Sequence, residues 1–229
     1  MTRYFEVLQR DGAARIGKLL IGDTKQTPFI LDTRTLNSKE SLIVDAGSVW
    51  ETGSLQAAEE GLNRIREEIG ENSLIILPQQ SYPPEVPEEI KDKIACKLDS
   101  NSSGPTGMAY RPGCRSDGRD MYIMEGAGCF ENNARQFFNT LLEMKKNISP
   151  DSAVYTPNIC LPENLAMLVY LGVDILDNTK ALVAAHNDIY LTTAGRFYLD
   201  SLAELPCRCE ACAGTSATKL KEMKKRERA

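Results

Sequence analysis

AVYTPNICLPENLAMLVYLGVDILD, residues 153–177, is the segment that decides the fold. Its short apolar runs at 153–155 and 173–177 have the length of buried strands, and the apolar spacing over 162–171 between them is typical of a helix. A strand, a helix and a second strand in this order predict parallel strands covered by helices. The same alternation begins upstream, where we expect a strand at 121–124 and a helix over 132–146.

The first half of the chain carries weaker signals of the same kind. Residues 4–8 and 14–21 flank the turn sequence at 10–12, which predicts an opening hairpin. The remaining expected elements are strands at 27–31, 41–45 and 74–77, a helix over 55–69 and a second helix from residue 88. Residues 99–119 are rich in Ser, Gly and Pro, and we expect them to form a long loop.

Length and composition favour one large domain with a small appendage, which we expect at residues 1–200 and 201–229. The chain has 229 residues, of which 42% are hydrophobic, and a formal net charge of −5. No apolar run is long enough to cross a membrane. Residues 218–229 hold six Lys and Arg against two Glu, so this basic tail is expected to contact tRNA phosphates or an acidic partner, or to be a solvated surface helix.

Three cysteines stand close together in PCRCEAC, residues 206–212. The C-x-C-x-x-C spacing of Cys207, Cys209 and Cys212 brings three thiolates within reach of one ion, and zinc prefers four such ligands in a tetrahedron. No histidine follows Cys212, so a zinc knuckle here needs a fourth ligand. The alternative is a turn with three unrelated cysteines. The other four cysteines are scattered singly, which suits a reducing cytoplasm better than a disulfide framework.

Two aspartates close apolar strands. Asp45 ends one expected strand and Asp177 ends another, and in parallel α/β folds the carboxyl ends of the strands form the functional face. Paired carboxylates suit chemistry at a glycosidic carbon, where one attacks and the other manages a proton. The alternative is that each aspartate caps a helix or a turn. Asp174 is expected to be structural, because odd spacing from Asp177 turns it to the opposite face.

Four motifs in order make the chain resemble the archaeal tRNA-guanine transglycosylases. The opening FEVLQRDGAARIGKL at 5–19 resembles the start of these proteins, and VDAGS at 44–48 is similar to their D-S-G-S/G segment. GVDILD at 172–177 is similar to their G-V-D-x-F-D segment, and residues 190–212 resemble their strand-and-zinc segment. The resemblance implies an α/β fold, an incomplete or irregular (β/α)8 TIM-type barrel with a small C-terminal zinc-knuckle segment.

The resemblance also implies roles for individual residues. Asp177 matches the nucleophile of the family and Asp45 its second catalytic aspartate. Cys207, Cys209 and Cys212 match three ligands of a structural zinc. Gly47 and Ser48, in the segment after Asp45, are candidate substrate-binding residues together with Trp50, which is expected either to line a pocket or to pack in the core. The sequence departs from the pattern at Ala46, where the family has serine, and it lacks counterparts of the segments that hold the base.

These departures make the chain similar to the N-terminal part of the archaeosine synthases. The resemblance then implies a tRNA-modification protein of the archaeosine pathway that acts on the deazaguanine-modified D-loop of tRNA. It would work as a partial subunit with a partner that carries the missing C-terminal domains, or as a homo-oligomer, in the cytoplasm and away from membranes. Two alternatives remain: an active base-exchanging tRNA-ribosyltransferase with Asp177 as nucleophile, and a non-catalytic zinc scaffold.

Overall fold

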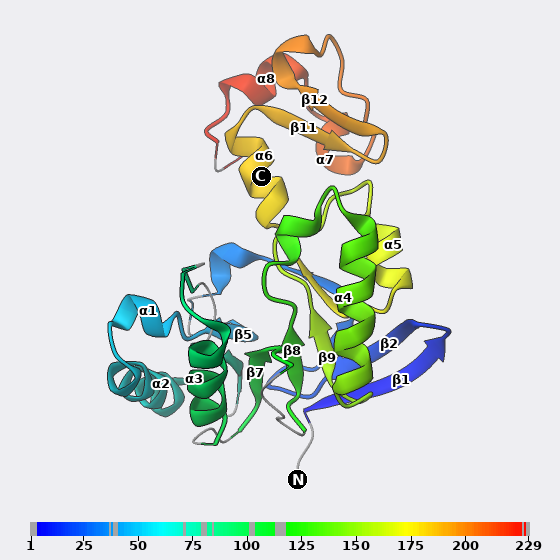
Figure 1. The fold of residues 1–229 in the computed structure, drawn as a ribbon. Helices are drawn as coiled ribbons and strands as arrows, with labels where there is room; N and C mark the ends of the chain where they lie inside the picture. Colours follow the sequence, from blue (N-terminus) through cyan, green and yellow to red (C-terminus); the bar gives the residue numbers. More distant parts are fainter. Residues whose placement is uncertain are drawn as a thin grey trace.

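The computed structural model describes residues 4–36, 38, 41–70, 72–78, 82–83, 85–100, 104–112, 118–225 and 227. Its centre is a curled sheet of seven parallel strands (Figure 1). The strands, in spatial order, are β4 (Phe29–Leu31), β10 (Ile175–Asp177), β9 (Ala153–Tyr155), β8 (Met121–Ile123), β7 (Thr106–Ala109), β6 (Leu74–Ile76) and β5 (Ile43–Asp45). The curl brings β5 back towards the segment after β4, where the Asp45 amide donates to the Leu36 carbonyl at 3.2 Å.

Helices connect β5 to β6, β6 to β7, β8 to β9 and β9 to β10, and the last two connections confirm the alternation predicted for the second half of the chain. They are α1 (Val49–Thr52), α2 (Leu55–Ile69), α3 (Glu88–Ser100), α4 (Ala134–Asn147) and α5 (Leu165–Tyr170), and α6 (Thr179–His186) follows β10. Short 3₁₀ turns lie at η1 (Thr33–Thr35), η2 (Ala127–Phe130) and η3 (Leu199–Ser201). Helix α2 shows how the sequence sets these bounds: the Ser54 hydroxyl accepts from the Ala57 amide at its start, and Gly70 ends it at φ +60°, as expected for a glycine after a helix.

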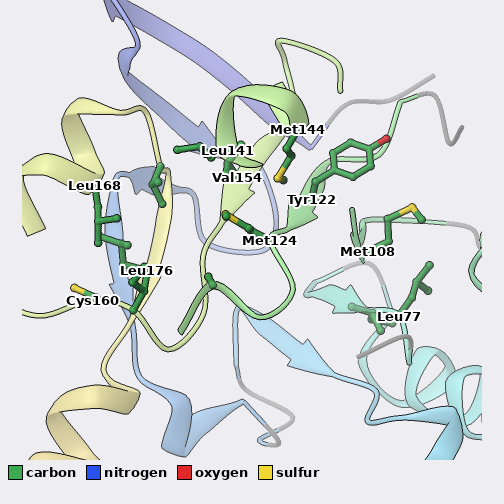
Figure 2. Close-up of a cluster of buried hydrophobic side chains, with 14 of the residues drawn as sticks. Leu77, Met108, Tyr122, Met124, Leu141, Met144, Val154, Cys160, Leu168 and Leu176 are labelled. Atoms are coloured by element: carbon green, nitrogen blue, oxygen red, sulfur yellow. The ribbon is translucent and has the colours of Figure 1, made fainter. Parts of the chain in front are cut away.

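Side chains alternate across the sheet and build two cores. The outer core holds Val154 and Leu176 from the strands against Leu141, Met144 and Leu168 from the helices. Figure 2 shows these residues pointing toward one another, with Tyr122 and Met124 beside them. The covering helices therefore bury their apolar faces on the outside of the curled sheet, and this burial is the main favourable contribution to the fold.

The inner core fills the concave side of the sheet. Ile43, Tyr155 and Ile175 belong to it, together with Phe5 and Leu19 from the N-terminal hairpin. That hairpin is part of a separate antiparallel sheet of β1 (Phe5–Asp11), β2 (Ala14–Leu19) and β3 (Lys25–Thr27). The opening hairpin is thus confirmed, and its apolar side chains cover the inside of the curled sheet.

A small unit follows the sheet. It contains the antiparallel pair β11 (Ile189–Thr192) and β12 (Gly195–Tyr198), then α7 (Glu210–Ala213) and α8 (Ala217–Glu222). Figure 1 shows these elements gathered beyond α6, away from the seven-stranded sheet. Part of the basic tail folds back on this unit, because Lys221 pairs with Asp200 at 2.7 Å and the Lys225 ammonium donates to the His186 carbonyl at 2.6 Å.

The structure corrects three expectations. The long loop expected over 99–119 contains β7, whose four residues TGMA are all buried and show no alternation by which a strand could be recognised. The single strand expected at 27–31 is two strands in different sheets, since Pro28 has no amide proton to continue a ladder. Cys96 on α3 is disulfide-bonded, so the expectation of reduced scattered cysteines is wrong there. Residues 101–103 and 113–117 of the expected loop lie outside the described residues. Within the described residues, no helix is both long and apolar enough to cross a membrane.

Candidate functional site

Asp177 is held in place by neighbouring donors at the carboxyl end of β10. Its Oδ2 atom accepts from the Tyr155 hydroxyl at 2.8 Å and from the Asn158 amide at 2.9 Å. Its Oδ1 atom accepts from the Thr179 amide at 3.0 Å. The residue is 1% exposed. Hydrogen bonds to an ionised acceptor are stronger than neutral ones, so these donors fix the carboxylate in one orientation.

Asp45 lies at the carboxyl end of β5, on the same face of the sheet as Asp177. Each aspartate follows an inner-core isoleucine by two residues, Ile43 and Ile175 respectively, and residues two apart in a strand share a face. The charges of both aspartates raise the pKa of the Tyr155 hydroxyl, although burial is the largest cause. Both carboxylates therefore lie within electrostatic reach of one buried phenol on the concave side.

The two carboxylates differ in their surroundings. Asp45 is half-buried and accepts one hydrogen bond, from the Gly47 amide at 2.9 Å. Burial raises its pKa, and the nearby charge of Glu51 adds to this shift, while the Gly47 hydrogen bond opposes it. A carboxyl group with a raised pKa holds its proton more readily than an ordinary aspartate does. Asp45 is the carboxyl group with this property, and Asp177, with three hydrogen-bond donors, is the more firmly positioned of the two.

The residues after Asp45 form a tight turn into α1. Gly47 adopts φ +81°, a conformation that favours glycine. The Ser48 hydroxyl caps α1 by accepting from the Trp50 amide at 3.2 Å, and Ser48 is buried. Trp50 is 61% exposed, so its ring is the surface-accessible group of the three residues expected to bind substrate. Ser48 therefore has a structural task as the N-cap of α1.

Cys160 is a further sulfur beside Asp177 but not a reactive one. Burial, and then the charge of Asp177, raise the pKa of its thiol to about 11. A cysteine acts as a nucleophile only as the thiolate. Cys160 therefore stays protonated near neutral pH and contributes to the outer core.

A charge cluster around the buried Arg111 lies beyond the carboxyl ends of β6, β7 and β8. The guanidinium of Arg111 pairs with Glu88 at 3.0 Å and with Glu125, and it lies 5.6 Å from the ring centre of Tyr82. The Arg111 side chain is 5% exposed. This arginine ties the segments after three neighbouring strands to the start of α3. Its position within the loop expected over 99–119 gave no signal of this role.

The three cysteines of the C-terminal unit converge. Their sulfur atoms all lie within 4.8 Å of one another, which fits a shared metal ion better than unrelated cysteines in a turn. The Cys209 amide donates to the Cys207 sulfur at 3.3 Å, and the Tyr190 hydroxyl lies 3.0 Å from the Cys212 sulfur. Within the part of the chain that the structure describes, no fourth His, Cys, Asp or Glu joins this group. Three soft donors can hold a thiophilic metal, with one position left for another ligand.

Sequence reasoning missed the partners of Asp177 and Tyr190. Tyr155 is the last residue of β9, next to β10 in the sheet, and only the strand order shows that their ends meet. Asn158 and Thr179 donate through the backbone, which leaves no mark in the side-chain pattern. Tyr190 belongs to the segment 190–212 that resembles the family, but its contact with Cys212 arises only because the chain returns from β11 to α7.

The fold and the site together define an α/β protein with a curled parallel sheet, two aspartates on its carboxyl-end face, and a separate cysteine cluster able to bind metal. Residues 112–229 match the family model of queuine tRNA-ribosyltransferase. The chain belongs to this family.

Two similar proteins align with nearly the whole chain. Archaeosine synthase subunit alpha of Methanosarcina acetivorans is 48% identical over 235 aligned residues, which cover 100% of this chain and 37% of that protein. Archaeosine synthase of Haloferax volcanii is 34% identical and covers 93% of this chain and 33% of that protein. The tRNA-guanine(15) transglycosylase of Pyrococcus abyssi is 34% identical over 42% of this chain and 16% of its own length. The chain thus spans about a third of the length of the archaeosine synthases it matches.

Proposed function

We propose that this chain is the transglycosylase-like part of an archaeosine synthase system and that it recognises the deazaguanine-modified nucleoside in the D-loop of tRNA. The observation that carries the proposal is the 48% identity to archaeosine synthase subunit alpha over the full chain. The name of that relative implies a second subunit, so the proposed partners are tRNA and a protein that supplies the remaining chemistry. A tRNA substrate makes the cytoplasm the proposed location.

The surroundings of Asp177 support recognition over attack. A carboxylate offers about four lone-pair positions, and three of those of Asp177 are taken by Tyr155, Asn158 and Thr179. Only Oδ1 keeps capacity for another partner. A carboxylate that is fixed and nearly saturated with donors can accept a hydrogen bond from a nucleoside, but its electron pairs are less available to a carbon atom. Trp50 is the exposed ring to which an extruded base can stack.

Base exchange is the second candidate, favoured by the placement of Asp45 and Asp177 on one face. In this reaction Oδ1 of Asp177 attacks C1′ while the bond from C1′ to the base nitrogen breaks. The departing base takes a proton from Asp45, and the incoming base then displaces Asp177 and returns a proton to Asp45. Catalytic roles for both aspartates are proposals that rest on the family resemblance, and substrate contacts of Gly47, Ser48 and Trp50 are proposals that rest on their position after Asp45.

One pair of assays separates the two candidates. Labelled guanine incorporation into an archaeal tRNA transcript is measured with the chain alone and with candidate partner subunits, and binding is measured to tRNA with and without the deazaguanine base. Recognition predicts no incorporation by the chain alone, tighter binding of the modified tRNA, and weaker binding by Asp177→Asn. Asp23→Asn, on the exposed loop between β2 and β3, is the matched control. Incorporation that Asp177→Asn abolishes would establish base exchange, and equal binding of both tRNAs would contradict recognition.

The cysteine cluster is proposed to hold zinc through Cys207, Cys209 and Cys212, with a fourth ligand from outside the described residues. When bound, the ion would supply a structural cross-link between α7 and the segment before it. Metal analysis under reducing conditions tests this, and less than about half an equivalent of zinc per chain would contradict a site that this chain fills alone.

The division at residue 200 is also a proposal, and the contact of Tyr190 with Cys212 favours counting β11 and β12 with the smaller unit. We further propose that the curled sheet is an incomplete (β/α)8 barrel.

A further inference from the structure

A small basic cavity lies at the amino ends of β9 and β10, at the opposite end of these strands from Asp177. Its volume is about 150 Å³, and the residues that line it include Arg10, Arg15 and Lys145. Pro150, which also lines it, precedes β9. The turn between β1 and β2 closes one side through Gly12 and Ala13. The cavity is therefore bordered by the hairpin, the end of α4 and the loop that leads into β9.

The charges around this cavity are not balanced. Arg15 is neutralised by the buried carboxylate of Asp174, at 2.8 and 2.5 Å. Arg10 makes a hydrogen bond to the Pro150 carbonyl at 2.7 Å, and Lys145 makes one to the Leu171 carbonyl at 2.6 Å. Neither bond supplies a negative charge. Two cations therefore remain without a carboxylate partner among the residues that line the cavity.

Lys145 shows the effect of this imbalance. Burial, and then the charge of Arg15, lower the pKa of its ammonium group to about 8, while Asp174 opposes this shift and Arg10 adds to it. The hydrogen bond to Leu171 uses one of the three ammonium protons. Gly172 leaves room for the Lys145 ammonium group, since a Cβ atom on Gly172 would lie 2.3 Å from the Lys145 Nζ atom and 2.0 Å from the Ala13 carbonyl oxygen.

We propose that this cavity binds a phosphate group. Arginine and lysine donors with unused protons are the usual ligands of a tetrahedral oxyanion, and the cavity is smaller than the roughly 300–1,000 Å³ of pockets that hold drug-sized ligands. One phosphate group matches both its size and its charge, and a nucleoside does not. The group is either inorganic phosphate or a phosphodiester of bound tRNA, and the site is separate from the face that carries Asp45 and Asp177.

The test is a titration of the ¹⁵N-labelled full chain with inorganic phosphate, against sodium chloride of equal ionic strength. Amide signals of Gly12, Ala13 and Ser149 should move with phosphate and saturate. Lys145→Met keeps the length of the side chain and should weaken phosphate binding about tenfold, the size of one charge-assisted hydrogen bond. Arg10→Gln is a second variant on an exposed residue that leaves the Arg15 pair intact, and it should weaken binding by a smaller factor. Lys18→Gln, on the same hairpin, is the matched control and should titrate like the parent.

A second arm identifies the source of the phosphate. If tRNA supplies it, adding tRNA moves the same three amide signals and inorganic phosphate competes for them; if free phosphate is the ligand, tRNA leaves these signals in place and phosphate moves them alone. Both results support the site and do not depend on the proposed enzymatic function. Equal shifts with phosphate and chloride, or a folded Lys145→Met and Arg10→Gln that bind like the parent, would overturn it.

Discussion

The buried pair of Arg15 and Asp174 should dominate the stability of the hairpin-to-sheet contact. Arg15 donates to both oxygens of Asp174 and to the carbonyls of Pro150 and Ser152, at 2.5–2.8 Å. Asp174 also accepts from the Val154 amide at 2.7 Å. Its side chain has no exposed surface, and that of Arg15 is 6% exposed. Removing either partner leaves the other charge buried without its counter-ion.

The expected magnitude follows from that burial. Breaking a buried ion pair by removing one partner costs about 3–5 kcal/mol, a large part of the roughly 5–15 kcal/mol by which native proteins are stable. Arg15→Met and Asp174→Asn should each show this loss in urea unfolding followed by circular dichroism. The melting temperature should fall by roughly 6–20 °C, since 1 kcal/mol shifts a domain of this size by about 2–4 °C. Together the two changes should cost clearly less than the sum of the single losses, because both remove the same interaction.

A control and a refuting result complete the experiment. Lys18→Met removes an exposed partner of Glu6, at 3.2 Å on the same hairpin, and should change stability by less than about 1 kcal/mol. The reasoning would be refuted by single variants within 1 kcal/mol of the parent (about the limit for an exposed pair), or by strictly additive losses in the double variant. Either result would mean that Arg15 is held by the carbonyls alone and that the charge of Asp174 contributes little.

Three further outcomes are expected. Tyr155→Phe removes the 2.8 Å hydrogen bond to Asp177 and should lower the free energy of unfolding by about 1.5–3 kcal/mol; unchanged urea unfolding would show that the backbone donors suffice. Tyr190→Phe should weaken metal binding by about 10–100-fold in competition with a chelator, as loss of a hydrogen bond to a ligand does, whereas exposed Tyr198→Phe should not; equal affinities would exclude this role. Burial lowers the pKa of Lys145 in the folded protein to about 8, whereas the ordinary lysine pKa is about 10.4. Between these two pH values Lys145 is therefore more protonated in the unfolded chain than in the folded one. The stability of the parent should therefore rise with pH across this window relative to Lys145→Met, and parallel pH profiles would contradict the lowered pKa.

The sequence predicts the elements that carry a strong period or a long apolar face. The helix expected over 132–146 is α4 (Ala134–Asn147), and the strands expected at 153–155 and 173–177 are β9 and β10. These segments are flanked by clear turn or cap residues, so local preference and tertiary packing agree. Strand β7 could not be predicted in this way because its four residues, TGMA, are all buried and show no alternation of apolar and polar side chains. Only pairing with β6 and β8 identifies it as a strand.

The candidate site was predictable to the extent that it depends on strand ends. Both aspartates were placed at carboxyl ends on one face from their positions after apolar runs. The hydrogen-bond donors of Asp177 could not be predicted, because Tyr155 and the Asn158 amide come close to Asp177 only through the order of the strands in the sheet. The same limit applies to Arg15 and Asp174, which are 159 residues apart in sequence. Long-range pairs of this kind depend on the topology of the chain, which the pattern of apolar and polar residues does not reveal.

The spacing of Asp174 and Asp177 separates two tasks on one short strand. Asp177 ends β10 on the concave face, where it meets Tyr155. Asp174 lies just before the strand, and its odd spacing turns it away to Arg15 at the other end. A shift of one residue would place a carboxylate in the inner core without a counter-ion and would remove the buried partner of Arg15. The motif GVDILD therefore fixes the register of β10 by charge as well as by apolar burial. This register places the Asp177 carboxylate within hydrogen-bond distance of its three donors.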